Sequence, residues 1–459
     1  MTDKDIKTLL HKYDKPGPRY TSYPTVPEWS DDFGHDDYIE ALKRASQSDE
    51  PLSMYIHIPF CRMRCFYCGC NTTITSNPEK PKEYLKALEK EINFVSSHLG
   101  KRNRLAQMHW GGGTPTYLTT EQIEQLFTII TSKFSFTDDA EIALEVDPRI
   151  TTPEQLRLLR KLGFNRISLG VQDFNTDVQK AIGRYQTEDE TEGLFSFCRE
   201  LGFSGINIDL IYGLPLQTVK NFSATIQHVI DMKADRVAVY SYAHLPSIKA
   251  HQRRISDDLL PKADEKYTLF ATAIEKFLDA GYVQIGMDHF ARPDDELALA
   301  VKNGRLYRNF MGYTSRRTPD MLGLGMSGIG DIGGAYAQNY SKIKTYMDPI
   351  SEGNSAVFRG CRLSDDDKIR RWTIVSIMCN GILDFAALKE TFGVEYSDYF
   401  SIEDGELSEF INDGLLEKSD SGLKITPRGM IFVRNIAMVF DAYLRRKTDG
   451  KTPLFSRTI

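Results

Sequence analysis

Strand-like and helix-like segments alternate along most of this chain, and the alternation limits the folds open to it. Short apolar runs recur at intervals of roughly 30–40 residues, as βα units produce; they lie at residues 54–58, 105–110, 140–146, 166–171, 205–211, 236–242 and 282–287. Amphipathic stretches with helical spacing lie between them, such as residues 83–94 and 153–160. This pattern predicts a parallel α/β sheet or partial barrel. The length of 459 residues predicts a further domain as well.

Four of the seven cysteines lie together, in the segment Cys61-Arg-Met-Arg-Cys-Phe-Tyr-Cys-Gly-Cys70. Cys61, Cys65 and Cys68 have the spacing C-x3-C-x2-C, and thiolates at such spacing favour zinc, copper(I) or an iron–sulfur cluster. A structural zinc site usually takes a second ligand pair, which the sequence lacks, although His57 could serve as a ligand. Three cysteines would leave one iron of a cluster open to a small molecule. The isolated cysteines are predicted to be core residues: Cys198, Cys361 and Cys379.

The composition is that of a globular protein without a membrane segment or a secretion signal. No apolar run approaches the roughly 18–20 residues that a spanning helix needs. The N-terminus lacks the charged-then-apolar layout of a signal peptide, so we expect a cytoplasmic protein. Thiols stay reduced in the cytoplasm, and the cysteine group therefore predicts a metal or catalytic site rather than disulfides. The net charge of −6 gives no reason to expect nucleic acid or a membrane as a partner.

Polar residues and glycines stand at the ends of several predicted strands. The cysteine segment follows a strand at residues 52–58 that Pro59 ends, and Glu145, Gln172 and Asp209 occupy similar places in later strands. Each could be an ordinary surface residue, but in βα barrels this end of the strands carries the active site. Gly111-Gly-Gly113 follows another strand, and glycines there would let backbone N–H groups approach a ligand closely.

The cysteine motif resembles the signature of the radical S-adenosylmethionine (SAM) enzymes. Further segments, together with Cys70, are similar to the oxygen-independent coproporphyrinogen III oxidase family: Pro18-Arg-Tyr-Thr-Ser-Tyr-Pro-Thr25, His109-Trp-Gly-Gly-Gly-Thr-Pro-Thr116, Gly286-Met-Asp-His-Phe-Ala-Arg-Pro-Asp-Asp-Glu-Leu297 and Phe455-Ser-Arg-Thr-Ile459. The similarity runs essentially from end to end. It implies a partial (β/α)6 TIM-like radical SAM barrel with an N-terminal arm and a mainly helical, winged-helix-like C-terminal domain.

The resemblance also implies cofactors and their ligands. One [4Fe-4S] cluster is expected on Cys61, Cys65 and Cys68. Cys70 is expected not to ligate iron, and our hypothesis is that it matters for catalysis or for the environment of the cluster. Two SAM molecules are expected. The positions that match contacts of the cluster-bound SAM are Tyr55, Gly112, Glu145 and Ile329. Those that match contacts of the second SAM are Tyr67, Gly113, Thr114, Gln172, Arg184, Asp209 and Ala243.

The reaction that the resemblance implies is an oxidative decarboxylation. A SAM-derived 5′-deoxyadenosyl radical removes a hydrogen from the β-carbon of a propionate side chain, and loss of CO2 and of one electron to an acceptor leaves a vinyl group. Two such rounds convert coproporphyrinogen III to protoporphyrinogen IX. Four substrate propionates require cationic groups, for which Arg19, His289 and Arg292 are the candidates. A flavodoxin-type or ferredoxin-type electron donor is the expected partner, and a monomer is the expected state.

The C-terminal part departs from the βα pattern. Residues 366–377, 384–390 and 435–444 are predicted helices, and residues 414–427 a hairpin wing. A winged helix suggests DNA binding, but residues 361–459 carry 14 Lys and Arg against 16 Asp and Glu, so a structural cap is favoured. The predicted divisions are an arm at residues 1–35, the barrel at 36–359 and the cap domain at 360–459.

Other interpretations stay open beside this one. A radical SAM haem chaperone or haem-modifying enzyme would share the cluster region, but such relatives generally lack Cys70 and the Arg-Tyr-Thr-Ser-Tyr-Pro arm. A non-catalytic iron–sulfur or zinc protein would leave the aligned Glu145, Gln172 and Asp209 without a role. The G-x-G-x-x-G match at residues 323–328 is not a dinucleotide site, because no βαβ frame with an acidic residue follows it.

Overall fold

The computed structural model describes residues 3–446, 455, 457 and 458, and for residues 3–7 the backbone alone. The chain divides into two compact units. The sheet unit comprises residues 30–282 and 316–362, and the helical unit comprises residues 1–29, 283–315 and 363–459. The sequence-based boundaries after residues 35 and 359 stay a prediction of the folding domains. Among the described residues, no helix has both the length and the apolar character needed to cross a membrane.

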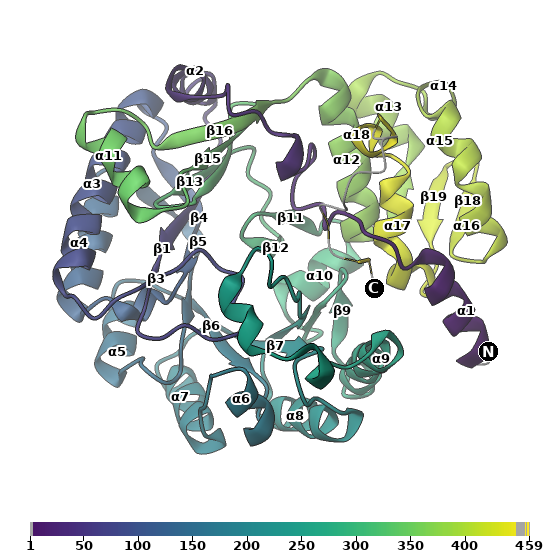
Figure 1. Ribbon diagram of the computed structural model, residues 1–459. Coiled ribbons are helices and arrows are strands. Elements are labelled where there is room, and N and C mark those ends of the chain that lie inside the picture. Colours follow the sequence, from purple (N-terminus) through teal and green to yellow (C-terminus); the bar gives the residue numbers. More distant parts are fainter. Residues whose placement is uncertain (1–2, 447–454, 456, 459) are drawn as a thin grey trace. The chain divides into compact units, whose positions relative to one another are not determined.

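A parallel sheet forms the centre of the sheet unit (Figure 1). Neighbouring strands follow chain order: β1 (Leu52–Ile58), β4 (Arg104–Gly112), β5 (Ser135–Val146), β6 (Arg166–Gln172), β7 (Gly205–Tyr212) and β8 (Arg236–Ser241). Helices follow these strands in turn: α3 (Glu79–Leu99), α4 (Thr120–Thr131), α5 (Pro153–Lys161), α6 (Thr176–Ala181), α7 (Glu188–Glu200), α8 (Val219–Asp231) and α9 (Ala263–Asp279). The predicted partial (β/α)6 barrel is thereby confirmed.

The sheet continues beyond β1 through the last part of the same unit. β13 (Met321–Leu324) pairs with β1 in parallel. It is followed by three antiparallel neighbours: β14 (Ile329–Ile332), β15 (Ala335–Asn339) and β16 (Val357–Arg362). α2 (His35–Ala45) and α11 (Ile343–Ser351) complete this side, and α11 packs against α3. Because β16 is the last strand in this direction, its side chains are less covered than those of the central strands.

Alternating burial and side-chain caps explain why these segments fold as they do. Met54, Ile56 and Ile58 of β1 are fully buried, and so are Leu85 and Leu88 on the predicted stripe of α3. Four of the helices begin with a capping box in which a threonine accepts a backbone N–H of the first turn; the threonines are Thr119, Thr152, Thr187 and Thr218. Apolar spacing and local caps thus act together to set the strand-to-helix rhythm.

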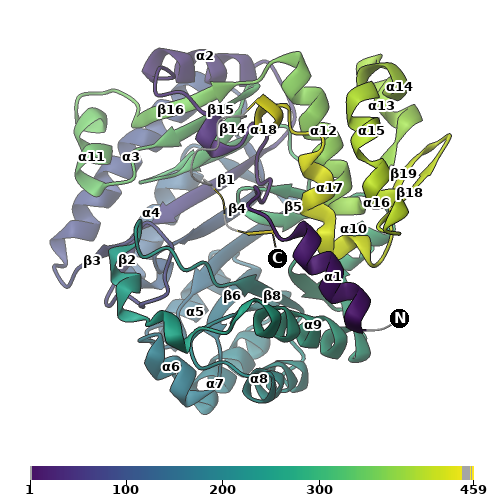
Figure 2. The same cartoon turned by 45° about the vertical axis from the view of Figure 1, so that its right-hand side comes forward.

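The helical unit combines a winged-helix-like group with the N-terminal segment (Figure 2). Its main helix is α12 (Asp365–Asn380), and the wing is the hairpin of β18 (Leu416–Ser419) and β19 (Gly422–Ile425), joined by β17 (Ile382–Asp384). The unit also contains α13 (Phe385–Phe392), α14 (Tyr396–Tyr399), α15 (Ser401–Glu406), α16 (Ser408–Asn412) and, from residues 283–315, β9 (Val283–Ile285), β10 (His289–Ala291), α10 (Glu296–Lys302), β11 (Tyr307–Asn309) and β12 (Gly312–Thr314).

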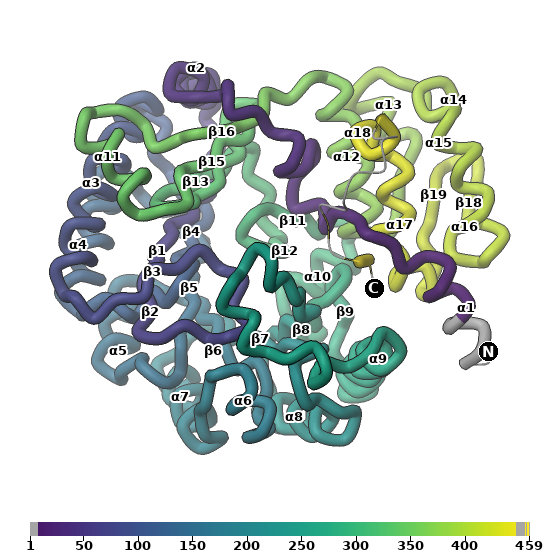
Figure 3. Tube along the Cα trace, in the orientation of Figure 1, coloured from purple at the N-terminus to yellow at the C-terminus, as the bar shows by residue number. Residues whose placement is uncertain are grey.

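The N-terminal segment runs along the C-terminal helices of this unit (Figure 3). It begins with α1 (Asp3–Tyr13), and an extended stretch then leads to the short helix η1 (Val26–Glu28). The buried Arg434 donates hydrogen bonds from α17 (Val433–Met438) to the carbonyl oxygens of Gly17 and Pro18. The predicted arm therefore has a fixed path in this structure.

Three sequence predictions are wrong in detail. Residues 282–287 do not continue the parallel series, because β9 is short, pairs antiparallel with β10 and is followed by Gly286 in the left-handed region. The predicted helix at 435–444 is broken into α17 and α18 (Ala442–Arg446), since the Asp441 carboxylate accepts the N–H groups of Tyr443 and Leu444 and starts a new helix. Cys361 is only half-buried, because it lies on the outer strand β16, whereas Cys198 and Cys379 are core residues as predicted.

Candidate active site

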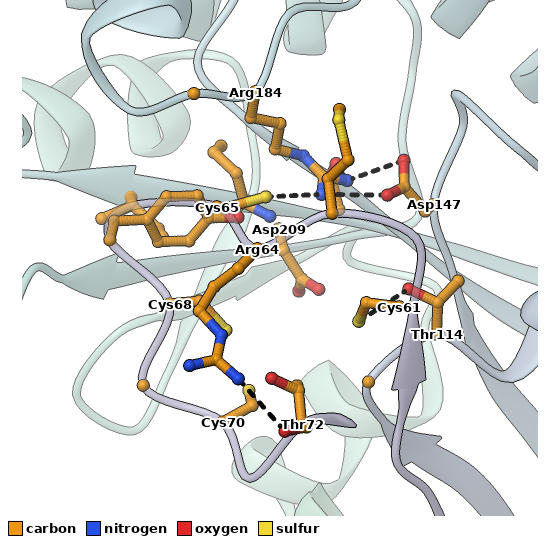
Figure 4. A pocket seen from close by; sticks show the side chains of 18 of the residues that line it. Cys61, Arg64, Cys65, Cys68, Cys70, Thr72, Thr114, Asp147, Arg184 and Asp209 are labelled. Carbon is orange, nitrogen blue, oxygen red and sulfur yellow. Dashed lines mark hydrogen bonds and ion pairs between the residues drawn. The ribbon is translucent and has the colours of Figure 1, made fainter. Parts of the chain in front are cut away.

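A large pocket lies at the carboxyl ends of the parallel strands of the sheet unit (Figure 4). Its volume is about 1130 Å³, and its described lining residues fall between positions 61 and 252. Thirteen of the predicted site residues line it: Cys61, Cys65, Tyr67, Cys68, Cys70, Gly112, Gly113, Thr114, Glu145, Gln172, Arg184, Asp209 and Ala243. They come from every strand end from β1 to β8, as the strand-end rule for barrels predicts. The pocket is the candidate active site.

The cysteine segment forms a loop across the pocket. It starts at the end of β2 (Phe60–Cys61), which pairs with β3 (Thr73–Ile74), so the eleven residues between them are closed at the base. Burial raises the pKa of Cys61 to about 11, whereas a hydrogen bond from Cys70 lowers the pKa of Cys68 to about 6. Cys65 is buried and Cys70 is exposed. The loop thus presents its thiols to one space, each in a different environment.

The geometry of the described residues does not suit a single zinc ion on this loop. Among the described residues, no three His, Cys, Asp or Glu side chains are close enough together to hold one metal ion. His57, the additional zinc ligand considered above, has both ring nitrogens engaged, with Tyr55 Oη at 3.1 Å and the Asn71 carbonyl oxygen at 2.8 Å. A zinc site on this loop would therefore need the loop and His57 to rearrange.

The glycine run at the end of β4 permits a close approach between backbone segments. A Cβ on Gly112 would lie 2.5 Å from the His57 ring, and Gly112 has a φ of +116°. A Cβ on Gly113 would lie 2.6 Å from the Pro59 backbone. The N–H groups of Gly112, Gly113 and Thr114 already bond to Glu145 Oε2, the Ile58 carbonyl and the Phe60 carbonyl. The prediction that these N–H groups face a ligand is therefore wrong; an ammonium group would suit the carbonyl oxygens of the run instead.

Glu145 ends β5 as an anionic side chain inside the pocket. Burial would raise its pKa, but His109 at 3.6 Å and the backbone N–H of Gly112 together hold the pKa below its usual value. The carboxylate is consequently ionised at neutral pH. An ionised carboxylate beside carbonyl oxygens suits a ligand that carries an ammonium group, such as the methionine part of SAM.

Two arginines share one carboxylate beside Cys65. Arg184 donates to Asp147 at 3.2 Å, and Arg149 donates to the same carboxylate at 2.7 and 2.9 Å. Burial opposes the charge on Asp147, yet Arg184 and then Arg149 hold its pKa below the usual value. Neither Asp147 nor Arg149 is among the site residues predicted from the sequence. The signal that could have found them is the Asp-Pro-Arg segment that directly follows the strand carrying Glu145.

Arg184 retains unused hydrogen-bonding capacity toward a ligand. Its Nη2 donates to the Gly170 carbonyl at 2.5 Å, but its buried Nε has no hydrogen-bond partner in the described part of the chain. A buried guanidinium N–H without a partner is costly, and a bound carboxylate would satisfy it. This observation fits the expected contact between Arg184 and the carboxylate of a SAM molecule.

Asp209 and Gln172 lie on the adjoining strands β7 and β6. Asp209 accepts hydrogen bonds from Ser168 at 3.0 Å and Asn207 at 2.7 Å, which fixes the orientation of its carboxylate. Gln172 has a φ of +71° and lies beside a register shift between β6 and β7. The bulge turns this end of β6 toward the pocket. Ser168 and Asn207 are supporting residues that the sequence did not single out.

A short helix after β8 holds the cysteine loop through hydrogen bonds to its backbone carbonyl groups. In η3 (Ala250–Arg254), the Gln252 amide donates to the carbonyl oxygens of Tyr67 at 2.8 Å and Ala243 at 3.2 Å, and its oxygen accepts the N–H of Leu245. His251 bonds to the Cys68 carbonyl at 2.7 Å. The loop and the Ala243 segment are thus joined by one buried amide. Sequence spacing gave no sign of this contact.

Two predicted SAM contacts do not line the pocket. Tyr55 lies in β1 with its hydroxyl on His57, and Ile329 begins β14 with its backbone against Gly323. A Cβ on Gly323 would lie 2.1 Å from the Ile329 carbonyl carbon, so the glycine of the G-x-G-x-x-G segment serves tight packing here. The roles of Tyr55 and Ile329 as cofactor contacts stay predictions.

The three predicted substrate residues belong to the helical unit. Arg19 and His289 meet at Asp288, at 3.3 and 2.8 Å, and Arg292 pairs with Asp294 at 3.3 Å on the surface. Burial would raise the pKa of Asp288, but His289, Arg308 and Arg19 hold it far below its usual value. Arg19 and His289 therefore form one charged group, and Arg292 stands apart from it.

Comparisons with known proteins agree with this geometry. The Radical SAM superfamily matches residues 55–229, and the HemN C-terminal domain matches residues 363–432. An oxygen-independent coproporphyrinogen III oxidase of Salmonella typhimurium is 46% identical over 451 residues, 98% of each chain, and that of Escherichia coli is 45% identical over the same share. The solved structure of the E. coli coproporphyrinogen III oxidase (HemN), described as a radical SAM enzyme, superimposes with a TM-score of 0.91 over 95% of this chain and 98% of that chain. This chain belongs to the oxygen-independent coproporphyrinogen III oxidase family of radical SAM enzymes.

Proposed function

We propose that this protein is a radical SAM oxidoreductase that decarboxylates two propionate side chains of coproporphyrinogen III to vinyl groups. The product would be protoporphyrinogen IX, so the protein would act in porphyrin and haem biosynthesis. The observation that carries the proposal is the agreement, over 98% of the chain, with relatives of that name, together with the thiol-lined pocket at the strand ends.

The chain's own residues fit the two cofactors of this family. Cys61, Cys65 and Cys68 would hold one [4Fe-4S] cluster. The cluster and SAM, when bound, supply the 5′-deoxyadenosyl radical that removes a hydrogen atom from the propionate. Glu145 offers an ionised carboxylate for the ammonium of the cluster-bound SAM, and Arg184 offers a buried guanidinium to a carboxylate.

The number of SAM molecules, the substrate contacts, the electron donor and the oligomeric state are further parts of this proposal. Two SAM molecules would occupy the pocket; its volume of about 1130 Å³ exceeds the ~300–1,000 Å³ typical of a single-ligand site. Tyr55 and Ile329 would contact the first SAM. Arg19 and His289, as one charged group, and Arg292 would meet the substrate propionates. A flavodoxin-type or ferredoxin-type donor would reduce the cluster, in a cytoplasmic monomer.

The turnover reaction tests the proposal under anaerobic conditions. The reconstituted protein would be given SAM, a strong reductant and coproporphyrinogen III, and the oxidised porphyrins and 5′-deoxyadenosine would be separated by chromatography. Protoporphyrin formed together with 5′-deoxyadenosine would support the proposal. SAM cleavage with unchanged coproporphyrinogen III would point to a haem chaperone or a haem-modifying relative. If no SAM were cleaved, the protein would instead be interpreted as a non-catalytic iron–sulfur or zinc protein.

A further inference from the structure

One half-buried arginine beside the cysteine loop, Arg149, is given no part in cluster or SAM binding by the proposed function. Arg149 Nη2 lies 3.7 Å from the sulfur of Cys65 and donates toward it. The side chain is only 16% exposed. Arg149 does not belong to the predicted cluster ligands, which are cysteines, or to the residues that match SAM contacts. Its position beside this sulfur therefore needs a separate explanation.

The position of Arg149 is strongly determined by its neighbours. It stands two residues after Asp147, in the turn between β5 and α5, and the turn folds its side chain back onto that carboxylate. Its backbone N–H, Nε and Nη2 donate to the Asp147 carboxylate at 3.1, 2.9 and 2.7 Å. Three bonds to one carboxylate leave the guanidinium little freedom, so the N–H that faces Cys65 is preorganised.

A second arginine reaches the same sulfur in a different way. Arg184 Nη1 lies 3.8 Å from Cys65 Sγ and also contacts Asp147 and, through Nη2, the Gly170 carbonyl. Its unpartnered Nε is the group suited to a ligand carboxylate. Arg184 therefore divides its donors between the sulfur, Asp147, the Gly170 carbonyl and a ligand, whereas Arg149 donates, within the described part of the chain, to Asp147 and the sulfur.

We propose that Arg149 raises the reduction potential of the cluster by holding a positive charge and an N–H donor against the sulfur of Cys65. This inference rests on the proposed function, because it takes Cys65 as a cluster ligand. Adding an electron makes the cluster more negative, so a fixed cation nearby stabilises the reduced form. Hydrogen bonds to ligand sulfurs act in the same direction, and both effects are strong where water is excluded.

The test is an anaerobic redox titration of the reconstituted protein, followed by electron paramagnetic resonance of the reduced cluster. In Arg149→Gln we expect the equilibrium constant for one-electron reduction to fall about tenfold, which corresponds to ~59 mV. Arg149→Lys keeps the positive charge but loses the bidentate hydrogen bonding to Asp147, so the reduction potential of its cluster should fall by a smaller amount. Arg157→Gln, an exposed arginine on α5, is the matched control and should titrate like the wild type.

The outcomes separate this inference from the proposed function. A wild-type protein that assembles no cluster would overturn both. A wild-type cluster with an unchanged midpoint potential in Arg149→Gln would overturn this inference alone, because a merely structural arginine would alter stability without moving the potential. If the Gln variant binds no cluster, Arg149→Met, which also removes the charge and the N–H donors, decides: a lowered potential supports the inference, and an unchanged one overturns it.

Discussion

The sulfur atoms of Cys61, Cys65 and Cys68 line one pocket, but each has different neighbours. Cys61 lies beside the Thr114 hydroxyl, Cys65 beside two guanidinium groups, and Cys68 beside Cys70. Both of these guanidinium groups, those of Arg149 and Arg184, therefore lie beside a single predicted cluster ligand, Cys65. An anionic cluster held by this loop would meet the two guanidinium groups beside Cys65, in the pocket that Glu145 and Arg184 also line.

Cys65→Ser should abolish most cluster binding, because a neutral hydroxyl is a poor ligand for iron. We expect the iron and sulfide content after reconstitution to fall to a small fraction of the wild-type content. Cys361→Ser, on β16 in the same unit, is the control and should bind a full cluster. Equal iron content in Cys65→Ser and the wild type would refute the assignment of this ligand.

Cys70→Ser tests the role of the fourth cysteine. Its thiol forms a hydrogen bond with Cys68 and is predicted not to ligate iron, so we expect near-normal iron content with turnover reduced by roughly an order of magnitude or more. Iron analysis and the porphyrin assay on the same sample measure both quantities. A variant with a full cluster and full activity would remove any special role for Cys70.

The strands and helices that carry the site were largely predictable, and the contacts between them were not. Apolar runs and strand-end residues such as Glu145 and Asp209 are visible in the sequence, because the alternation of strands and helices brings those ends together. Gln252 is more than 180 residues from Tyr67, and only the folded chain makes them partners. The broken helix at Asp441 shows the same limit: apolar spacing favoured one helix, and a side-chain cap divided it.

Gln252→Ala should loosen the cysteine loop without unfolding the sheet unit. The carbonyl oxygens of Tyr67 and Ala243 would lose their donor, a cost of about 1–3 kcal/mol for buried groups. We expect turnover to fall about tenfold or more, since small displacements of reacting groups are costly. Hydrogen exchange across residues 61–72, compared with turnover, measures the effect.

The exposed Gln227→Ala, on α8, is the matched control for this variant. It should leave both hydrogen exchange in the loop and turnover unchanged. If Gln252→Ala kept both the hydrogen exchange rate of the loop and the turnover of the wild type, the proposed role of Gln252 in holding the cysteine loop would be contradicted.

In the molecule as a whole, the predicted cofactor site and the predicted substrate contacts belong to different units. All described residues that line the pocket belong to the sheet unit, whereas the three substrate candidates belong to the helical unit. Within the helical unit, Arg434 connects parts distant in sequence, because it donates to the carbonyl oxygens of Gly17, Pro18, Arg457 and Thr458. One buried cation thus fixes both the N-terminal segment and residues near the C-terminus.

Arg434→Met should release the N-terminal segment. Several buried carbonyl groups would lose their donor, so we expect the free energy of unfolding to drop by about 2–3 kcal/mol or more. Protease cleavage within residues 14–25 should become faster. Lys424→Met, an exposed change on β19 of the same unit, should behave like the wild type. Unchanged cleavage in Arg434→Met would argue against this anchoring.

The transfer of a hydrogen atom from substrate to cofactor tests the proposed function most directly. Coproporphyrinogen III carrying deuterium at the propionate β-carbons would be incubated anaerobically with the reconstituted, reduced protein and SAM, and the 5′-deoxyadenosine analysed by mass spectrometry. We predict that deuterium appears in the 5′-deoxyadenosine as vinyl groups form. Formation of 5′-deoxyadenosine without deuterium, beside unchanged coproporphyrinogen, would contradict the account.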